Sequence, residues 1–388
     1  MFNFDFYNPT HIVFGKDRLG ELDTLVPKDA KVLITYGGGS AVRSGLIDRI
    51  TKALGNRKVE QFGGIEPNPS LETCERAVAF IKDHDIDFVL AVGGGSVVDA
   101  TKLIVLGAKY DGPVLDVLKA GVPAVPTSMV PEAVPFGTVM TLPATGSEMN
   151  NGAVITYGDG KFPVFSDLVF PKFSMLDPTL TFTLPEKQVK NGVIDTFVHT
   201  TEQYLTYPVD GRIQDRFAEG ILQTMIEIGR QTVEEPENYD VRANHVWAST
   251  LALNSLIGAG VPQDWATHLI GHELTAAYHL DHGITLAIVL PALLTVKKAD
   301  KLDKLVQYAE RVWHIEEGTK DEKADAAIAK TREFFESLGV STHLKDYDLD
   351  ETSIERIVKQ LEEHGMVALG EHGDITPDVA REILKRAL

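Results

Sequence analysis

The sequence predicts an α/β domain with a parallel sheet, followed by an all-α domain. Up to about residue 184, short β-rich runs alternate with amphipathic stretches, which is typical of βα units that place helices on both faces of a parallel sheet. From residue 185 onward, apolar residues recur at three- and four-residue spacing, which indicates amphipathic helices. We therefore expect two domains, 1–184 and 185–388, and each is long enough to bury its own core.

The first domain begins with strands and helices in alternation. Its expected strands are HIVFG at 11–15, KVLITY at 31–36, VEQFGGI at 59–65 and FVLAV at 88–92, and its expected helices are 46–55 and 71–85. A proline-rich segment between Asp111 and Pro143 cannot continue a helix, so we expect a surface loop over the sheet that ends in the strand-like TVMTLP. In the second domain the expected helices include 216–235, 240–258 and 353–365.

The composition argues against several classes of function. Among 388 residues, 56 acidic residues outnumber 37 basic ones, and the net charge of −19 disfavours binding to nucleic acid or to an anionic membrane surface. Cys74 is the only cysteine, so neither an intrachain disulfide nor a cysteine-rich metal site can form, and a cytoplasmic location is expected. The longest apolar run, LAIVLPALLTV, is too short to span a bilayer and contains Pro291, and we recognise no targeting segment.

The tetrapeptide GGGS occurs twice, at 37–40 and at 93–96, each time directly after an apolar strand. Glycine lets the backbone approach a ligand closely, and the free N–H groups of a following helix attract an anion such as a phosphate. The match to G-x-G-x-x-G is incomplete because Val98 stands three positions after Gly95, and no Walker lysine follows the turn. Taken alone, such a turn is more often plain tight-turn geometry than a ligand site.

The first of the two turns also bears on the kind of dinucleotide that could bind. In dinucleotide-binding folds a carboxylate at such a strand end usually holds the ribose 2′-hydroxyl, and it repels a 2′-phosphate. Here the turn contains only glycine and serine, and Arg43 follows shortly after it. If this turn holds the adenine ribose, NADP is favoured over NAD.

Histidine and aspartate side chains gather in two stretches of the second domain. In NGVIDTFVHTTEQY, Asp195 and His199 are four residues apart and so share one face of a helix. In DWATHLIGHELTAAYHLDHG, His268 and His272 have the same spacing, and His282 follows. Carboxylate and imidazole ligands suit Zn²⁺ or Fe²⁺ and do not suit Ca²⁺ or Mg²⁺. Spacing alone leaves the alternative open that these residues form a polar helix face or hydrogen-bonded core histidines.

The whole chain resembles the metal-dependent, iron-containing (group III) alcohol dehydrogenases. The resemblance rests on several motifs in the same order, which are NPTHIVFG, FGGIEPNPS, AVGGGSVVDATK, TLPATGSE, MLDP, NGVIDTFVHTTEQY, GAGVPQDWATHLIGHEL and LDHGITLAIVLP. Within the family the chain is most similar to the bacterial NADPH-dependent branch that reduces aldehydes, which has the same ITYGGGS turn. The resemblance implies the dehydroquinate synthase-like architecture, with an NADP-binding α/β domain, a helical metal-binding domain and the active site between them.

The resemblance also implies a set of site residues. The implied metal ligands are Asp195, His199, His268 and His282, whereas His272 falls near the nicotinamide and the substrate, where it is the best side-chain candidate for a proton relay. The implied cofactor-binding residues are Gly38, Gly39, Ser40, Asn68, Gly94, Gly95, Ser96, Asp99, Thr141, Thr145, Asn150, Lys161 and Leu180. Of these, Lys161 is the best candidate to neutralise a 2′-phosphate, although a lysine after Gly-Asp-Gly would otherwise be read as a solvated turn residue.

The function implied by the resemblance is the reduction of short- to medium-chain aldehydes to primary alcohols by NADP(H) and one divalent metal, Fe²⁺ or Zn²⁺, per subunit. The alternatives are an NAD-dependent butanol or glycerol dehydrogenase, a dehydroquinate-synthase-like lyase, and a sensor without activity. A homodimer is expected because the strand at 11–15 would leave an exposed sheet edge. The segment 112–136 departs from the aldehyde-reducing branch, so the substrate entrance is expected to differ.

Overall fold

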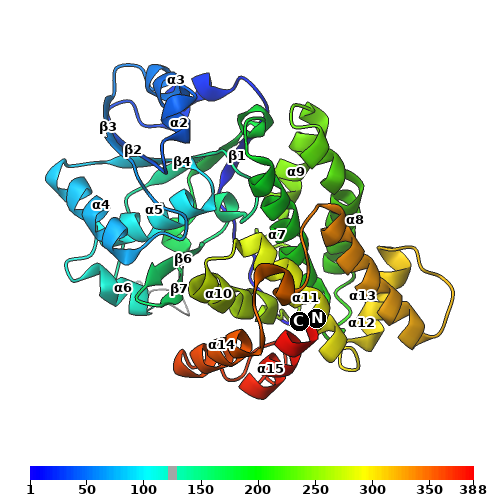
Figure 1. The fold of residues 1–388 in the computed structure, drawn as a ribbon. Coiled ribbons are helices and arrows are strands. Elements are labelled where there is room, and N and C mark those ends of the chain that lie inside the picture. The colour runs from blue at the N-terminus through cyan, green and yellow to red at the C-terminus, as the bar shows by residue number, and fades with distance from the viewer. Residues whose placement is uncertain (121–128) are drawn as a thin grey trace. The chain divides into compact units, whose positions relative to one another are not determined.

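The computed structural model describes residues 1–120 and 129–388 of the chain (Figure 1). These residues form two compact units, one of Tyr7–Leu184 and one of Pro185–Leu388 together with Met1–Phe6. The first unit contains a parallel sheet with helices and the second is helical, so the predicted fold class is confirmed. The functional role assigned to each half stays a prediction.

The sheet of the first unit has six strands in the order β1-β8-β5-β4-β2-β3, and all neighbours are parallel. The strands are β1 His11–Phe14, β2 Lys31–Tyr36, β3 Lys58–Phe62, β4 Phe88–Gly93, β5 Phe136–Met140 and β8 Phe173–Leu176. A separate antiparallel hairpin joins β6 Gly152–Tyr157 to β7 Gly160–Phe165. The helices are α1 Leu22–Leu25, α2 Ser40–Arg43, α3 Leu46–Ala53, α4 Leu71–Asp83, α5 Gly95–Gly107 and α6 Val114–Ala120.

Both faces of this sheet are covered. Along β4, Val89 and Ala91 pack into one apolar cluster, whereas Leu90 and Val92 point to the other face and pack into a second cluster. This two-residue alternation puts apolar side chains on both faces, which is why the strand sequences are almost continuously hydrophobic. Figure 1 shows α4, α5 and α6 on one side of the sheet and α2 and α3 on the other.

One predicted loop is wrong in part. Residues 114–120, within the proline-rich segment, form α6, and Val114, Val117 and Leu118 are buried at helical spacing. Pro113 stands just before the helix, where its missing N–H costs nothing, and its carbonyl accepts a hydrogen bond from the Asp116 N–H at 2.9 Å. Residues 121–128 of the segment lie outside the described residues. The expectation that the segment 112–136 alters the substrate entrance therefore stays a prediction.

The second unit is built from nine α-helices within its described residues. They are α7 Glu186–Tyr204, α8 Arg212–Glu234, α9 Tyr239–Ala252, α10 Ala266–Tyr278, α11 His282–Val296, α12 Leu302–Arg311, α13 Lys320–Ser337, α14 Glu351–Glu363 and α15 Pro377–Arg386. The helix predicted at 240–258 ends at Ala252 instead, and Ser255, within the predicted range, adopts a positive φ angle of 73° that an α-helix cannot include. Over the described residues, none of the helices has the length and hydropathy that crossing a membrane requires.

Helix α7 lies at the centre of this unit. It packs against α8, α9, α10 and α11, so every residue from Gly192 to Tyr204 is buried. A helix that is buried all round normally has an apolar sequence, yet α7 carries Asp195, His199 and Glu202 on one face. Because buried polar groups need hydrogen-bond or metal partners, this face of α7 is a candidate for the functional site.

Candidate functional site

Three imidazoles meet one carboxylate oxygen inside the second unit. Asp195 and His199 come from α7, His268 from the first turn of α10, and His282 is the first residue of α11. The Nε2 atoms of His268 and His282 each lie 3.4 Å from Asp195 Oδ1. The Nε2 atom of His199 lies 3.5 Å from the same oxygen. The structure therefore brings together all four side chains that the family resemblance implied as metal ligands.

This cluster fits a divalent cation of borderline softness. The ligand atoms of Asp195, His268 and His282 lie within 4.8 Å of one another, and the ring of His199 stacks on that of His268 at 4.5 Å. Asp195 is only 3 % exposed, and one carboxylate with three imidazoles is a donor set suited to Zn²⁺ or Fe²⁺. The four residues are therefore suited to hold the metal, and their assignment as its ligands stays a prediction.

The charges in the cluster favour replacement of a proton by a metal ion. Burial by itself would raise the pKa of Asp195, but His199 and His282 hold that pKa well below its usual value. Burial would lower the pKa of His268, but Glu202 and Asp195 outweigh it and raise the pKa to about 9. The two carboxylates thus favour a positive charge at His268, and a bound cation would take the place of the proton that supplies it.

Glu202 is a functional candidate that the sequence analysis missed. Its Oε2 contacts His268 Nδ1, on the opposite side of the ring from Asp195. The signal was present, because Glu202 follows Asp195 by seven residues and His199 by three, which puts all three on one helix face. Sequence alone could not show that this face points at the start of α10.

His272 lies beside the four ligand candidates. It is one turn after His268 on α10, and its ring centroid is 5.2 Å from that of His282 and 6.1 Å from that of His268. Its separation from the implied metal ligands stays a prediction. Its role as a proton relay stays a prediction.

In the first unit, the two GGGS turns lie next to each other. The first follows β2 and the second follows β4, and these strands are parallel neighbours whose last paired residues are Tyr36 and Val92. The chain continues from β2 to β3 on one side and from β4 to β5 on the other, so the order of the sheet reverses between β2 and β4. In open α/β sheets, ligands bind at the carboxyl ends of the strands at such a reversal.

Packing within the protein already requires glycine at parts of the second turn. A Cβ on Gly93 would lie 2.6 Å from Val97 Cγ2, and one on Gly95 would lie 2.3 Å from Thr145 Oγ1. Gly94 precedes the 13-residue helix α5 and has no side chain to cap it. Tight-turn geometry and a helix N-terminus without a side-chain cap are therefore both present, and the second is what a phosphate would use.

Several predicted cofactor-binding residues lie around these turns. Lys161 on β7 donates a hydrogen bond to Asn68 Oδ1 at 2.6 Å, and the Asn68 N–H lies 3.4 Å from Ser96 Oγ. The Thr141 N–H donates to the carbonyl of Gly93 at 2.9 Å. Around the first turn, Ser40 starts α2 and Gly39 has a positive φ of 92°, while Leu180 packs against the apolar cluster on the α3 side of the sheet. Their roles toward a cofactor stay predictions.

Asp99 and Asn150 are held by protein partners. Asp99 Oδ1 accepts a hydrogen bond from Ser147 Oγ at 2.5 Å and Oδ2 accepts one from the Val154 N–H at 2.9 Å. Asn150 Oδ1 accepts from the ammonium of Lys102 at 2.8 Å. These contacts tie α5 to the segment 145–154, so both residues can shape the edge of the site as well as touch a ligand.

Lys102 was also missed by the sequence analysis. It is fully buried, and its ammonium additionally donates to Ser147 Oγ at 2.9 Å and to the Gly152 carbonyl at 2.7 Å. Burial lowers its pKa to about 8, against the opposing charges of Asp99 and Glu148. Lys102 therefore anchors the segment that carries Thr145 and Asn150.

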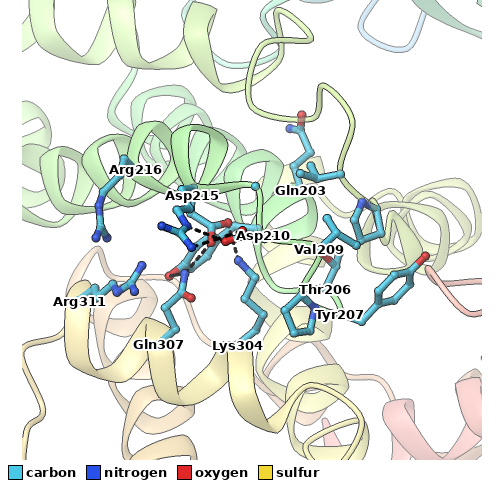
Figure 2. Close-up of a pocket in the computed structure, with 16 residues that line it drawn as sticks. Gln203, Thr206, Tyr207, Val209, Asp210, Asp215, Arg216, Lys304, Gln307 and Arg311 are labelled. Atoms are coloured by element: carbon cyan, nitrogen blue, oxygen red, sulfur yellow. Dashed lines mark hydrogen bonds and ion pairs between the residues drawn. The ribbon is translucent and has the colours of Figure 1, made fainter. Parts of the chain in front are cut away.

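The second unit also contains a cavity of about 490 Å³ that none of the predicted site residues lines (Figure 2). It is bounded by the end of α7, the loop to α8 and one side of α12. Its charged groups bind one another, since Lys304 pairs with Asp215 at 2.5 Å and Arg311 pairs with Glu219 at 3.0 Å. Mutual pairing explains these charges without a ligand.

Comparisons with known proteins place the whole chain in one family. Residues 9–178 match the family described as iron-containing alcohol dehydrogenase, and residues 189–388 match the C-terminal part of the same family. The chain is 57 % identical over 392 residues to the NADPH-dependent aldehyde reductase YqhD of Escherichia coli (strain K12), with all of both chains covered. It is 39 % identical over 395 residues to a probable NADH-dependent butanol dehydrogenase 1 of Bacillus subtilis (strain 168), again over all of both chains.

Two solved structures of similar proteins have the same fold over the whole chain. The substrate- and cofactor-free aldehyde reductase YqhD from E. coli superimposes with a TM-score of 0.94 at 54 % identity, with all of both chains covered. The NADH-dependent butanol dehydrogenase A of Thermotoga maritima superimposes with a TM-score of 0.93 at 33 % identity, covering 100 % of this chain and 99 % of the other.

Proposed function

Because the chain belongs to the iron-containing alcohol dehydrogenase family, we propose that it is an NADP(H)-dependent aldehyde reductase whose helical unit binds one divalent metal ion. The observation that carries the proposal is the convergence of three imidazole Nε2 atoms on Asp195 Oδ1. The full-length likeness to an NADPH-dependent aldehyde reductase supports the choice of reaction and cofactor.

The reaction adds one hydride, from NADPH, to the carbonyl carbon of an aldehyde and one proton to its oxygen, and a divalent ion supplies Lewis-acid polarisation of that carbonyl. Asp195, His199, His268 and His282 are the residues that would hold the ion. Burial of Asp195 keeps water from screening its charge, so the attraction between this carboxylate and a cation is strong. His272, which borders these residues, is placed to pass a proton, since imidazole exchanges protons near neutral pH.

Preference for NADPH is assigned to the first glycine turn and to Lys161. The turn has no carboxylate to repel a 2′-phosphate, and no heavy atom from beyond the two neighbouring residues lies within 4 Å of the position that a Cβ on Gly38 would take. Lys161 adds a positive charge beside Asn68. An uncharged first turn and the ammonium of Lys161 beside Asn68 together favour the cofactor with the extra phosphate.

Steady-state kinetics with butanal test the proposal. With the metal-loaded protein, we expect NADPH absorbance to fall when butanal is added, and kcat/KM for NADPH to exceed that for NADH by about tenfold or more, a difference of about 1.4 kcal/mol. A protein that binds metal but consumes neither cofactor would be a sensor or a lyase rather than a reductase. Equal kcat/KM values for NADH and NADPH would refute the argument from the first turn.

We also propose that two copies of the chain associate. Strand β1 forms an edge of the sheet in the first unit, and edge strands tend to be covered by pairing. In the second unit, Met1, Phe2, Phe4 and Phe6 are between 47 % and 63 % exposed, although the Phe2 N–H is tied to the Gly260 carbonyl at 2.8 Å. An ordered row of exposed apolar side chains indicates an interface.

Light scattering should therefore give twice the 42.5 kDa mass of one chain, and replacing Phe2 and Phe4 with aspartate should shift the mass toward that of one chain. Exchange of the half-exposed Val367 for aspartate, on the loop after α14, is the matched control and should leave the mass unchanged. A wild-type mass of 42.5 kDa would rule out the association.

We also propose that the protein is located in the cytoplasm. Recovery of the protein with membranes in cell fractionation would contradict this location.

A further inference from the structure

Glu202 holds the beginning of α10 at two points. Its side chain is almost completely buried, at 2 % exposed for the whole residue. One carboxylate oxygen, Oε2, contacts Nδ1 of His268, and the other, Oε1, accepts a hydrogen bond from the Thr267 N–H at 2.6 Å. The same carboxylate therefore fixes the ring of His268 and the backbone of the residue before it.

We propose that Glu202 is the positioning residue that presents His268 to the metal. A neutral imidazole has one N–H and one lone pair, so a proton held at Nδ1 by Glu202 leaves the lone pair at Nε2. That Nε2 atom lies 3.4 Å from Asp195 Oδ1, on the side where the other imidazoles converge. Carboxylates behind ligating histidines select the tautomer, orient the ring and make the nitrogen more basic.

Buried hydrogen bonds and an ion pair fix the position of Glu202 relative to α10. The carbonyl of Glu202 accepts a hydrogen bond from the Asp264 N–H at 2.8 Å, and Asp264 Oδ1 accepts one from the Ala266 N–H at 3.0 Å. Asp264 Oδ2 also pairs with the ammonium of Lys301 at 2.7 Å. Since a buried charge without its partner is costly, this arrangement resists sliding of α7 against α10.

Lys301 extends these contacts to the C-terminal part of the chain. It is 1 % exposed, and its ammonium also contacts Glu371 Oε1 at 2.6 Å and the Leu205 carbonyl at 2.8 Å. Leu205 follows the last residue of α7, so the cation links the end of that helix to the turn before α10. The position of Glu202 is thus determined by several elements together.

Charge balance supports the same role. Asp195 and Glu202 place two carboxylates in a site where both residues are at most 3 % exposed. A divalent cation bound by neutral imidazoles would neutralise both carboxylates, and this is the state that a low-dielectric interior favours. The inference rests on the proposed metal site and adds to it the residue that orients one of its ligands.

Zn²⁺ affinity tests the inference. When a chelator is titrated into the Zn²⁺-loaded protein, we expect Glu202→Gln to raise the apparent dissociation constant for Zn²⁺ by about 10- to 100-fold relative to wild type. The matched control is Glu273→Gln, because Glu273 is also 2 % exposed and contacts a histidine, His364, at 3.0 Å, outside the cluster. It should change Zn²⁺ affinity by less than about threefold, although both variants lose a buried carboxylate.

A merely structural role would lower the melting temperature of both variants and leave their Zn²⁺ affinities equal, and that result would overturn the inference. Nitrogen-15 NMR of the Zn²⁺-loaded wild type provides a measurement that needs no variant. We expect His268 to bear its proton on Nδ1, and a proton on Nε2 would also overturn the inference. Failure of wild type to bind Zn²⁺ or Fe²⁺ would instead refute the proposed function.

Discussion

Replacement of His268 with alanine should remove the bound metal and lower kcat/KM for aldehyde reduction with NADPH by about 10³-fold, or about 4 kcal/mol of transition-state stabilisation. The imidazole lies between two buried carboxylates, with Nε2 at 3.4 Å from Asp195 and Nδ1 in contact with Glu202. Alanine removes one predicted ligand and leaves Glu202 without its partner. The remaining acidic residues and imidazoles cannot compensate, because their positions are fixed on α7 and α11.

Metal content by atomic emission and kinetics with butanal check this result together. His364→Ala is the matched control, since it also removes an imidazole that contacts a buried carboxylate, Glu273, but outside the cluster. The control should keep its metal and most of its activity. A His268→Ala protein with full metal content and wild-type turnover would show that the ligand assignment is wrong.

Replacement of Gly38 with aspartate should lower kcat/KM for NADPH by about 10- to 100-fold and leave kcat/KM for NADH unchanged or higher, which corresponds to about 1.4–3 kcal/mol of charge repulsion. The side chain has room, since no heavy atom from beyond the two neighbouring residues lies within 4 Å of the position of its Cβ. Gly39 is not suitable for the same experiment, because its φ of 92° would strain any other residue.

Gly38→Asn is the control that separates charge from size. Asparagine has nearly the shape of aspartate without its charge, so it should retain most of the activity with NADPH. If asparagine and aspartate reduce kcat/KM for NADPH equally, bulk rather than charge is responsible. The assignment of cofactor preference to the uncharged first turn would then be wrong.

The sequence predicted the parts of this protein that depend on local periodicity. Strand β4 alternates its side chains between two apolar clusters, and the helices of the second unit follow a three- and four-residue apolar pattern. Both patterns depend only on which face of a strand or helix is buried. They can therefore be recognised in the sequence without knowledge of the elements that pack against that face. Helix α6 was missed because the prolines around 114–120 masked a short apolar stripe.

Glu202 and Lys102 were missed for a different reason. Their partners, Thr267 and His268 in one case and Ser147, Asn150 and Gly152 in the other, are at least 45 residues away along the chain. A buried charge can be recognised only when the tertiary neighbours that bind it are known. The family resemblance implied which residues bind the metal and the cofactor. It did not imply Glu202 and Lys102, which position some of those residues.

The measurement that tests the account most directly is the restoration of activity by metal. The purified protein is stripped by a chelator, and NADPH-dependent reduction of butanal is followed while Zn²⁺ or Fe²⁺ is added back. We expect the stripped protein to remain folded but inactive, and activity to return in proportion to bound metal up to one ion per chain. Full activity in the stripped protein, with no further gain on adding either metal, would contradict the account.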